Sequence, residues 1–109
     1  MPIERREYSR FKKALHVIIH NPYAQRDLVT SDISMGGACI SNVQKYYSQD
    51  QAISLEITLD DGSSIFCEAR VVSSYPRTKD AEVYMINLQF MEMPDSDKER
   101  LKACIETPE

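Results

Sequence analysis

The sequence predicts an all-β fold, a six-stranded antiparallel β-barrel with a short C-terminal α-helix. Apolar and polar residues alternate in several short runs, as they do in strands that bury one face. Turn residues join successive runs without a helical segment between them, which favours antiparallel pairing. Closure of such a sheet into a barrel removes its exposed edges. A helical pattern occurs only after Pro94.

Each expected strand is bounded by turn residues. The strands are expected at residues 14–20, 26–33, 38–43, 53–59, 64–74 and 82–91. The first run is rich in β-branched residues and ends at Asn21-Pro22. The fourth and fifth runs flank Asp60-Asp61-Gly62-Ser63, the strongest hairpin turn of the chain. Tyr75-Pro76 is expected to break the fifth strand, because proline cannot donate a ladder hydrogen bond.

The C-terminal segment has the pattern of a short helix. Ser96 and Glu99 are three residues apart, the spacing of a capping box. Leu101, Cys104 and Ile105 follow at helical spacing and predict one apolar face. This face suits either the end of the barrel or a partner, and the sequence leaves both open.

Length and composition indicate one globular domain. The 109 residues suffice for one core, and 42% hydrophobic with 28% charged residues excludes disordered and fibrous classes. No apolar run approaches the ~20 residues of a membrane span, and no apolar segment of a secretory signal follows the N-terminal charges. We therefore expect a cytoplasmic protein. Three widely spaced cysteines among apolar neighbours, Cys39, Cys67 and Cys104, are expected to be buried thiols without a metal.

Charge divides the chain into two parts. Residues 1–13 carry five basic and two acidic side chains, and the remainder carries eight basic and fifteen acidic ones. We expect a flexible basic N-terminal arm over residues 1–13 and a barrel with its helix over 14–106. The acidic body disfavours binding to a nucleic acid polymer, whereas the basic arm can capture a small anion.

The segment from Asp32 to Gly37 is the first candidate site. Asp32 and Ser34 are two residues apart, so in a strand both side chains would lie on one face. A carboxylate accepts hydrogen bonds, and a hydroxyl donates or accepts them. Gly36 and Gly37 can adopt a positive φ and can let a ligand approach main-chain N–H groups. The alternative is an ordinary turn, because Asp, Ser and Gly are common turn formers.

Arg6 and Arg10 form the second candidate site. A separation of four residues places both side chains on one side of the chain in a helix or in a strand. A guanidinium group binds phosphate or the edge of guanine through paired hydrogen bonds, and it stacks on a purine. The alternative is a solvated tail in which Glu4 and Glu7 are loose ion-pair partners.

Motifs of the common enzyme classes are missing from the sequence. It contains no G-x-S-x-G elbow, no P-loop and no H-E-x-x-H motif. His16 and His20 share a strand face, but no carboxylate or thiol nearby in the sequence completes a metal site. We therefore expect a binding protein without catalytic residues and without a metal.

Together the two candidate sites resemble the signature of the PilZ domain family. R-x-x-x-R occurs as Arg6 and Arg10, and D-x-S-x-x-G follows as Asp32, Ser34 and Gly37. The resemblance extends over nearly the whole chain, because the barrel with a C-terminal helix is also the PilZ architecture. It implies a receptor for the bacterial second messenger cyclic di-GMP that needs no other cofactor. Such a receptor relays its signal to a protein partner in motility, biofilm or exopolysaccharide control.

The resemblance also implies which residues bind the ligand. They are Arg5, Arg6, Arg10, Asp32, Ser34, Gly36 and Gly37. Arg6 and Arg10 would hold phosphates and guanine edges, with Arg5 in support. Asp32 and Ser34 would bond the guanine and the sugar-phosphate rim, and the glycines would admit the ligand to the turn. Binding would fold the arm over the barrel, and a partner protein would sense the new surface.

Two other classes of binding protein compete with this interpretation. A ligand-independent adaptor with the same barrel would dock a partner protein directly, since one fold serves many functions. A small barrel for single-stranded nucleic acid is disfavoured by the acidic body and by the absence of an obvious row of exposed aromatic residues in the sequence.

Overall fold

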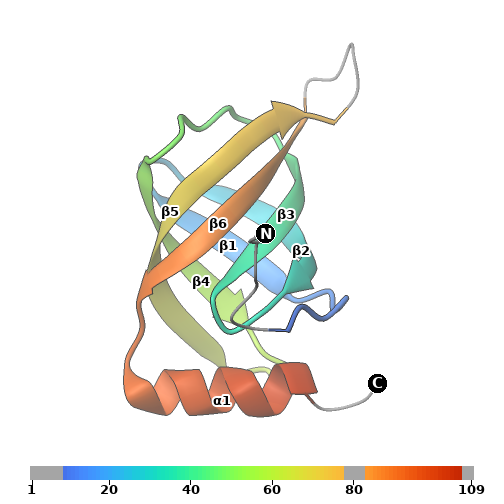
Figure 1. Ribbon diagram of the computed structural model, residues 1–109, viewed down its shortest axis with the longest axis vertical. Helices are drawn as coiled ribbons and strands as arrows, with labels where there is room; N and C mark the ends of the chain where they lie inside the picture. Colours follow the sequence, from blue (N-terminus) through green and yellow to red (C-terminus); the bar gives the residue numbers. More distant parts are fainter. Residues whose placement is uncertain (1–8, 78–82, 107–109) are drawn as a thin grey trace, which may run out of the picture.

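The computed structural model describes residues 9–77 and 83–106, which form six strands and one helix. The elements are β1 (His16–Asn21), β2 (Gln25–Ile33), β3 (Gly37–Val43), β4 (Ala52–Thr58), β5 (Ser64–Pro76), β6 (Tyr84–Glu92) and α1 (Asp95–Glu106). The strands form a closed barrel in the order β1-β2-β3-β6-β5-β4, and all neighbours are antiparallel. The predicted fold class and strand order along the chain are confirmed (Figure 1).

The end of β5 differs from the prediction. The strand continues through Tyr75 to Pro76, and Pro76 is paired with Tyr84 of β6. The Arg77 amide donates to the Val83 carbonyl at 3.1 Å, so the pairing of the two strands extends to the proline itself. The expected break at Tyr75-Pro76 is therefore wrong. A proline at the last residue of a strand removes one donor and leaves its neighbours free to pair.

Alternating side chains of the strands fill the barrel. The strand residues of this core include Val17, Ile19, Ile40, Leu55, Ile57, Ile65, Ile86 and Leu88. The loop between β3 and β4 adds Tyr47, which is fully buried and accepts a hydrogen bond from Gln25 Nε2 at 2.7 Å. Burial of these side chains provides the main stabilisation of the fold.

Helix α1 covers one end of the barrel. Its buried residues are Leu101, Cys104 and Ile105, the apolar face predicted from the sequence. Figure 1 shows α1 lying across the lower end of the barrel, so the end-covering alternative holds. Arg100 holds the helix to the β4–β5 turn by donating to Ser63 Oγ at 2.6 Å.

The start of α1 differs from the expected capping box. The helix begins at Asp95, so Ser96 lies inside the first turn rather than at the cap. The first helical hydrogen bond runs from the Lys98 amide to the Pro94 carbonyl at 3.0 Å. Asp95 and Asp97 place negative charge at the positive end of the helix dipole, which stabilises this start.

The three cysteines are free and buried, as predicted. Burial raises the pKa of Cys67 to about 12, so this thiol stays protonated at neutral pH. Among residues 9–77 and 83–106, no three His, Cys, Asp or Glu side chains gather in a group that could hold a metal ion. The described part of the chain also contains no helix of the length and apolarity needed to cross a membrane.

Candidate ligand site at the β2–β3 turn

The N-terminal segment is attached to the barrel before β1 begins. Phe11 and Ile33 form an antiparallel bridge, with hydrogen bonds of 2.8 Å from the Phe11 amide to the Ile33 carbonyl and 2.9 Å in return. The arm predicted for residues 1–13 is therefore fixed to the end of β2 from Phe11 onward. Arg5 and Arg6 lie outside the described residues.

Thr30 fixes the next residues of this segment. Its hydroxyl donates to the Lys13 carbonyl at 2.5 Å and accepts a hydrogen bond from the Leu15 amide at 2.9 Å. Lys13 is buried and forms an ion pair with Asp60, 2.7 Å from Nζ to Oδ2. Sequence reasoning missed Thr30, because a single threonine in a strand gives no signal of a contact with residues 15 positions away.

The bridge at Phe11 brings Arg10 to Asp32. Arg10 Nε donates to Asp32 Oδ1 at 2.8 Å, and Nη2 of the same guanidinium bonds the same oxygen. Both side chains are about 30% exposed, so solvent screens the pair only in part. Two of the predicted site residues, 22 positions apart in the sequence, thus form one charged pair at the surface.

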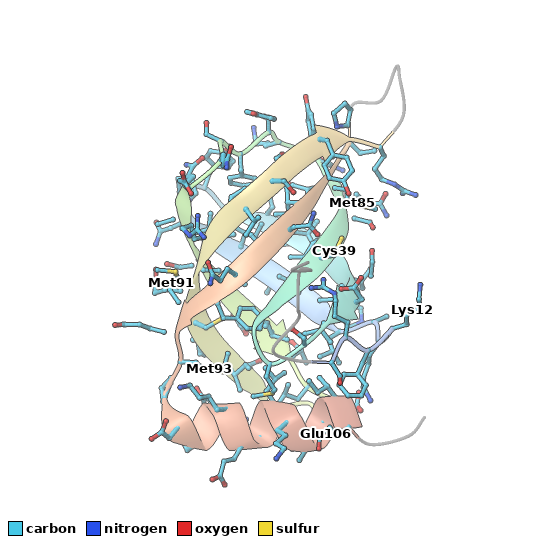
Figure 2. The ribbon with its side chains drawn as sticks, in the orientation of Figure 1. Lys12, Cys39, Met85, Met91, Met93 and Glu106 are labelled. Atoms are coloured by element: carbon cyan, nitrogen blue, oxygen red, sulfur yellow. The ribbon has the colours of Figure 1, made fainter. Side chains whose placement is uncertain are left out.

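Cys39 lies beside this pair. It is the cross-strand partner of Asp32, at a point where the β2–β3 register shifts. Burial raises the pKa of the Cys39 thiol, and the Asp32 carboxylate raises it further while Arg10 lowers it. Figure 2 labels Cys39 on β3. The neutral thiol adds no charge to the site at neutral pH.

Ser34 is directed into the turn and not toward solvent. It is buried, and its Oγ accepts hydrogen bonds from the amides of Gly36 at 3.0 Å and Gly37 at 3.2 Å. The expectation that Asp32 and Ser34 lie on one strand face is wrong, because β2 ends at Ile33. Buried amides require an acceptor, and the Ser34 hydroxyl supplies it.

Gly37 is needed for close packing of two strands. A Cβ at this position would lie 2.0 Å from the Leu88 carbonyl oxygen on β6, far inside contact distance. Gly36 and Gly37 do not use the positive φ that glycine can adopt, since Gly62 alone among the described glycines has one. The Gly36 carbonyl accepts a hydrogen bond from the Phe90 amide at 2.9 Å, which ties the turn to β6.

A groove of about 680 Å³ adjoins this turn. Ser9, Phe11, Met35 and Gly36 line one part of it, together with residues of β6. Helix α1 contributes Lys98, Lys102 and Glu106. The turn therefore lies between a charged pair, formed by Arg10 and Asp32, and a groove with apolar and charged walls.

The chain is similar to proteins of one family. A family model described as PilZ domain matches residues 4–107. Among solved structures, the Bacillus subtilis inhibitor of motility MotI/DgrA matches with a TM-score of 0.79 and 26% identity, covering 94% of this chain and 51% of that chain. The complex of K. pneumonia MrkH with c-di-GMP matches with a TM-score of 0.70 and 22% identity, covering 93% and 51%.

A third solved structure, the PilZ domain of CeSA from a cellulose-synthesizing bacterium, has a TM-score of 0.61 and 18% identity, covering 89% of this chain and 94% of that chain. The likenesses to MrkH and CeSA, at 22% and 18% identity, show the fold alone. The chain spans about half the length of the MotI and MrkH chains, 51% in each case. No curated protein matches the sequence.

Proposed function

The chain belongs to the PilZ domain family, and on this premise we propose that it is a receptor for cyclic di-GMP that acts through a protein partner in motility or biofilm control. The observation that carries the proposal is the pairing of Arg10 with Asp32 beside the β2–β3 turn. Two relatives by structure support it, since one is named an inhibitor of motility and the other was solved with c-di-GMP.

The charged pair suggests how the ligand would enter. Asp32 offers its carboxylate to the N–H groups of a guanine, which present donors as the Arg10 guanidinium now does. Arg10, once displaced, becomes free to bind a phosphate or to stack on a base. Each charged hydrogen bond of the free protein is thus replaced by another in the complex, so opening the pair costs little net free energy.

Ser34, Gly36 and Gly37 have a different role in this proposal from Asp32. The Ser34 hydroxyl and the missing side chain of Gly37 fix the shape of the turn. They would therefore contribute to binding mainly by holding Asp32 at the end of β2. Arg5 and Arg6 are proposed as additional phosphate and guanine contacts from the arm.

Ligand binding is proposed to fold the arm over the barrel, with Phe11 as its fixed point. Ordering of a segment on binding costs conformational entropy, and charged hydrogen bonds to the ligand offset this cost. Trypsin is then expected to cut after Arg5 or Arg6 more slowly in the complex than in the free protein. Equal cleavage rates would argue against this ordering step.

Calorimetric titration with cyclic di-GMP tests the proposed function, and separate titrations with GTP and cyclic GMP are the specificity controls. We expect saturable binding of cyclic di-GMP alone, weakened in Arg6→Ala and Asp32→Ala. Arg77→Ala is the matched control, because Arg77 bonds Asn42 away from the turn. Absence of binding and of any rise in melting temperature would contradict the receptor and favour a ligand-independent adaptor.

A further inference from the structure

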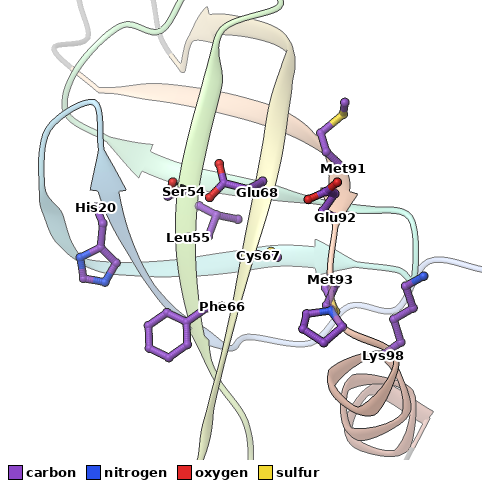
Figure 3. Close-up of a pocket in the computed structure, with 11 residues that line it drawn as sticks. His20, Ser54, Leu55, Phe66, Cys67, Glu68, Met91, Glu92, Met93 and Lys98 are labelled. Carbon is purple, nitrogen blue, oxygen red and sulfur yellow. Dashed lines mark hydrogen bonds between the residues drawn. The ribbon is translucent and has the colours of Figure 1, made fainter.

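Two large apolar side chains are exposed on the outer face of β5 and β6. Phe66 is 58% exposed and Met91 is 56% exposed. They line one cavity of about 740 Å³, together with Met93 and Pro94 at the start of α1 (Figure 3). His20 stacks on the Phe66 ring at 6.4 Å between centroids. Large apolar side chains exposed around one cavity are a feature of interaction sites in soluble domains.

Met91 is placed there by an irregularity of the ladder. Ala69 is paired with Phe90 and Glu68 is paired with Glu92, so Met91 has no partner on β5. This is the arrangement of a β-bulge, in which the extra residue redirects its side chain. Bulges are common beside functional sites, and this one directs a methionine outward at the mouth of the cavity.

Carboxylates surround the apolar residues. Glu68 and Glu92 are cross-strand partners and both line the cavity. Their carboxylates diverge, since Glu68 points toward Ser54 and away from Glu92 (Figure 3). Glu68 accepts a hydrogen bond from Ser54 Oγ at 2.8 Å. Glu56, the cross-strand partner of Phe66, accepts one from His20 Nε2 at 2.9 Å, and this bond lowers the pKa of Glu56.

The basic groups at the cavity do not neutralise these carboxylates. Among the described residues that line it, Lys98 and His20 are the only basic ones. Lys98 Nζ lies 3.8 Å from Asp95 Oδ1, and His20 is bonded to Glu56. The face therefore combines exposed apolar side chains with a lining that holds two glutamates and one lysine, and so carries a net negative charge.

We propose that the surface made by Phe66, Glu68, Met91 and Glu92, here called the Phe66 face, docks a protein segment that carries lysine or arginine beside a bulky apolar side chain. The apolar side chain of the partner would enter the cavity that Phe66 and Met91 both line. Its cations would pair with the carboxylates of Glu68 and Glu92, which line the same cavity. A second copy of this chain is disfavoured, because an acidic face would meet itself and the chain carries a net charge of −4.

The Phe66 face lies next to the candidate ligand site but does not depend on it. Met91, Glu92, Met93 and Lys98 line both this cavity and the groove that reaches Gly36. A segment docked here would therefore contact the same β6–α1 junction that borders the turn. The docking proposal stands on the exposed residues and charges alone, so it holds or fails independently of cyclic di-GMP binding.

The test uses a short peptide with lysines around a central leucine, titrated into the protein and followed by NMR. A matched peptide with glutamates in place of the lysines is the charge control. We expect the lysine peptide to shift signals of Phe66 and Met91, and its affinity to fall at least about fivefold in Phe66→Ala and in the double variant Glu68→Gln/Glu92→Gln. Val72→Ala, an exposed apolar position elsewhere on β5, should leave the affinity unchanged.

Three outcomes would overturn the proposal. One is equal affinity of the lysine and glutamate peptides, which would remove the role of the carboxylates. Another is unchanged affinity in the Phe66 and glutamate variants, whose folding is verified by their melting temperatures. The third is a concentration-dependent dimer that Phe66→Ala dissociates, because it would assign the face to a second copy of this chain.

Discussion

The β2–β3 turn and the β4–β5 turn are built from the same residue types and are held in different ways. In the β4–β5 turn the Asp61 carboxylate is satisfied locally: its Oδ1 accepts hydrogen bonds from the Ser63 amide at 2.9 Å and the Ser63 hydroxyl at 2.6 Å. Leu59 and Ser63 close the hairpin with a 2.7 Å bond. Asp61 is exposed, and its carboxylate is engaged within its own turn.

The β2–β3 turn depends on distant parts of the chain. Phe11 bonds the end of β2, and Phe90 of β6 bonds the carbonyl of Gly36. Ser34 satisfies the turn amides from inside, so Asp32 is left to face Arg10. The comparison teaches that an aspartate beside Ser and Gly is either engaged within its own turn, as Asp61 is, or presented to another part of the chain, as Asp32 is. The contacts made outside the turn decide which.

The largest expected difference between the two turns is the loss of stability caused by Gly37→Ala and by Gly62→Ala. Its Cβ would collide with the Leu88 carbonyl, so β3 and β6 must move apart, at a cost of about 3 kcal/mol in the free energy of unfolding. A Cβ at Gly62 would meet open space, so Gly62→Ala should lower the free energy of unfolding only because of the positive φ of 88°, by about 1 to 2 kcal/mol. Urea unfolding of both variants measures the difference, and a smaller loss in Gly37→Ala would refute the packing argument.

Alanine substitutions at Asp32 and at Asp61 should show that only the first of the two aspartates takes part in ligand binding. Asp32→Ala and Arg10→Ala are each expected to weaken cyclic di-GMP binding by about 1 to 3 kcal/mol, because a charged hydrogen bond to the ligand is lost. Asp61→Ala, in a turn of the same composition, should bind as the parent does. Calorimetry on the three variants decides the matter, and equal affinities in all of them would remove the site from the β2–β3 turn.

The attachment of the N-terminal segment can be weakened on its own. Thr30→Val keeps the shape of the side chain but leaves the Leu15 amide and the Lys13 carbonyl without their partner, at a cost of about 1 to 3 kcal/mol. Thr58→Val in β4 is the control and should change stability by no more than about 0.5 kcal/mol. Thermal unfolding that shows equal effects would contradict the anchoring role of Thr30.

The smallest expected effect concerns the local turn. The hydrogen bonds from Ser63 lower the pKa of Asp61, so this carboxyl is more acidic in the folded chain than in the unfolded chain. Its contribution to stability is present above the unfolded pKa and is lost as the pH falls through the folded value. Ser63→Ala should raise the pKa of Asp61, as followed by NMR of the carboxyl carbon. An unchanged value would show that the turn does not hold this carboxylate.

Periodicity was sufficient to predict the barrel from the sequence. Alternation along residues 53–59 and 64–74 marks half-buried strands, and the residue types of Asp60–Ser63 mark the hairpin turn between them. The helical face of Leu101, Cys104 and Ile105 was equally visible, and the structure shows what it covers. Such features are encoded by neighbours in the sequence, so one sequence suffices to find them.

The β2–β3 turn could be predicted only in part. Asp32 and Arg10 were found by their chemistry, and the structure brings them together. The close approach of Gly37 to Leu88 depends on strand β6, and Leu88 lies more than 50 residues later in the sequence. Periodicity carries no information on such contacts. Arg5 and Arg6 lie outside the described residues, so their place at the site stays a prediction.

The central claim is that the ligand replaces Arg10 as the hydrogen-bond partner of Asp32. NMR of the Arg10 Nε–H group during a cyclic di-GMP titration tests this claim most directly. We predict that this signal and the Asp32 carboxyl carbon shift together and saturate with the ligand, because the 2.8 Å bond between them is replaced. Saturable binding by calorimetry with both signals unmoved would contradict the exchange and place the ligand elsewhere on the barrel.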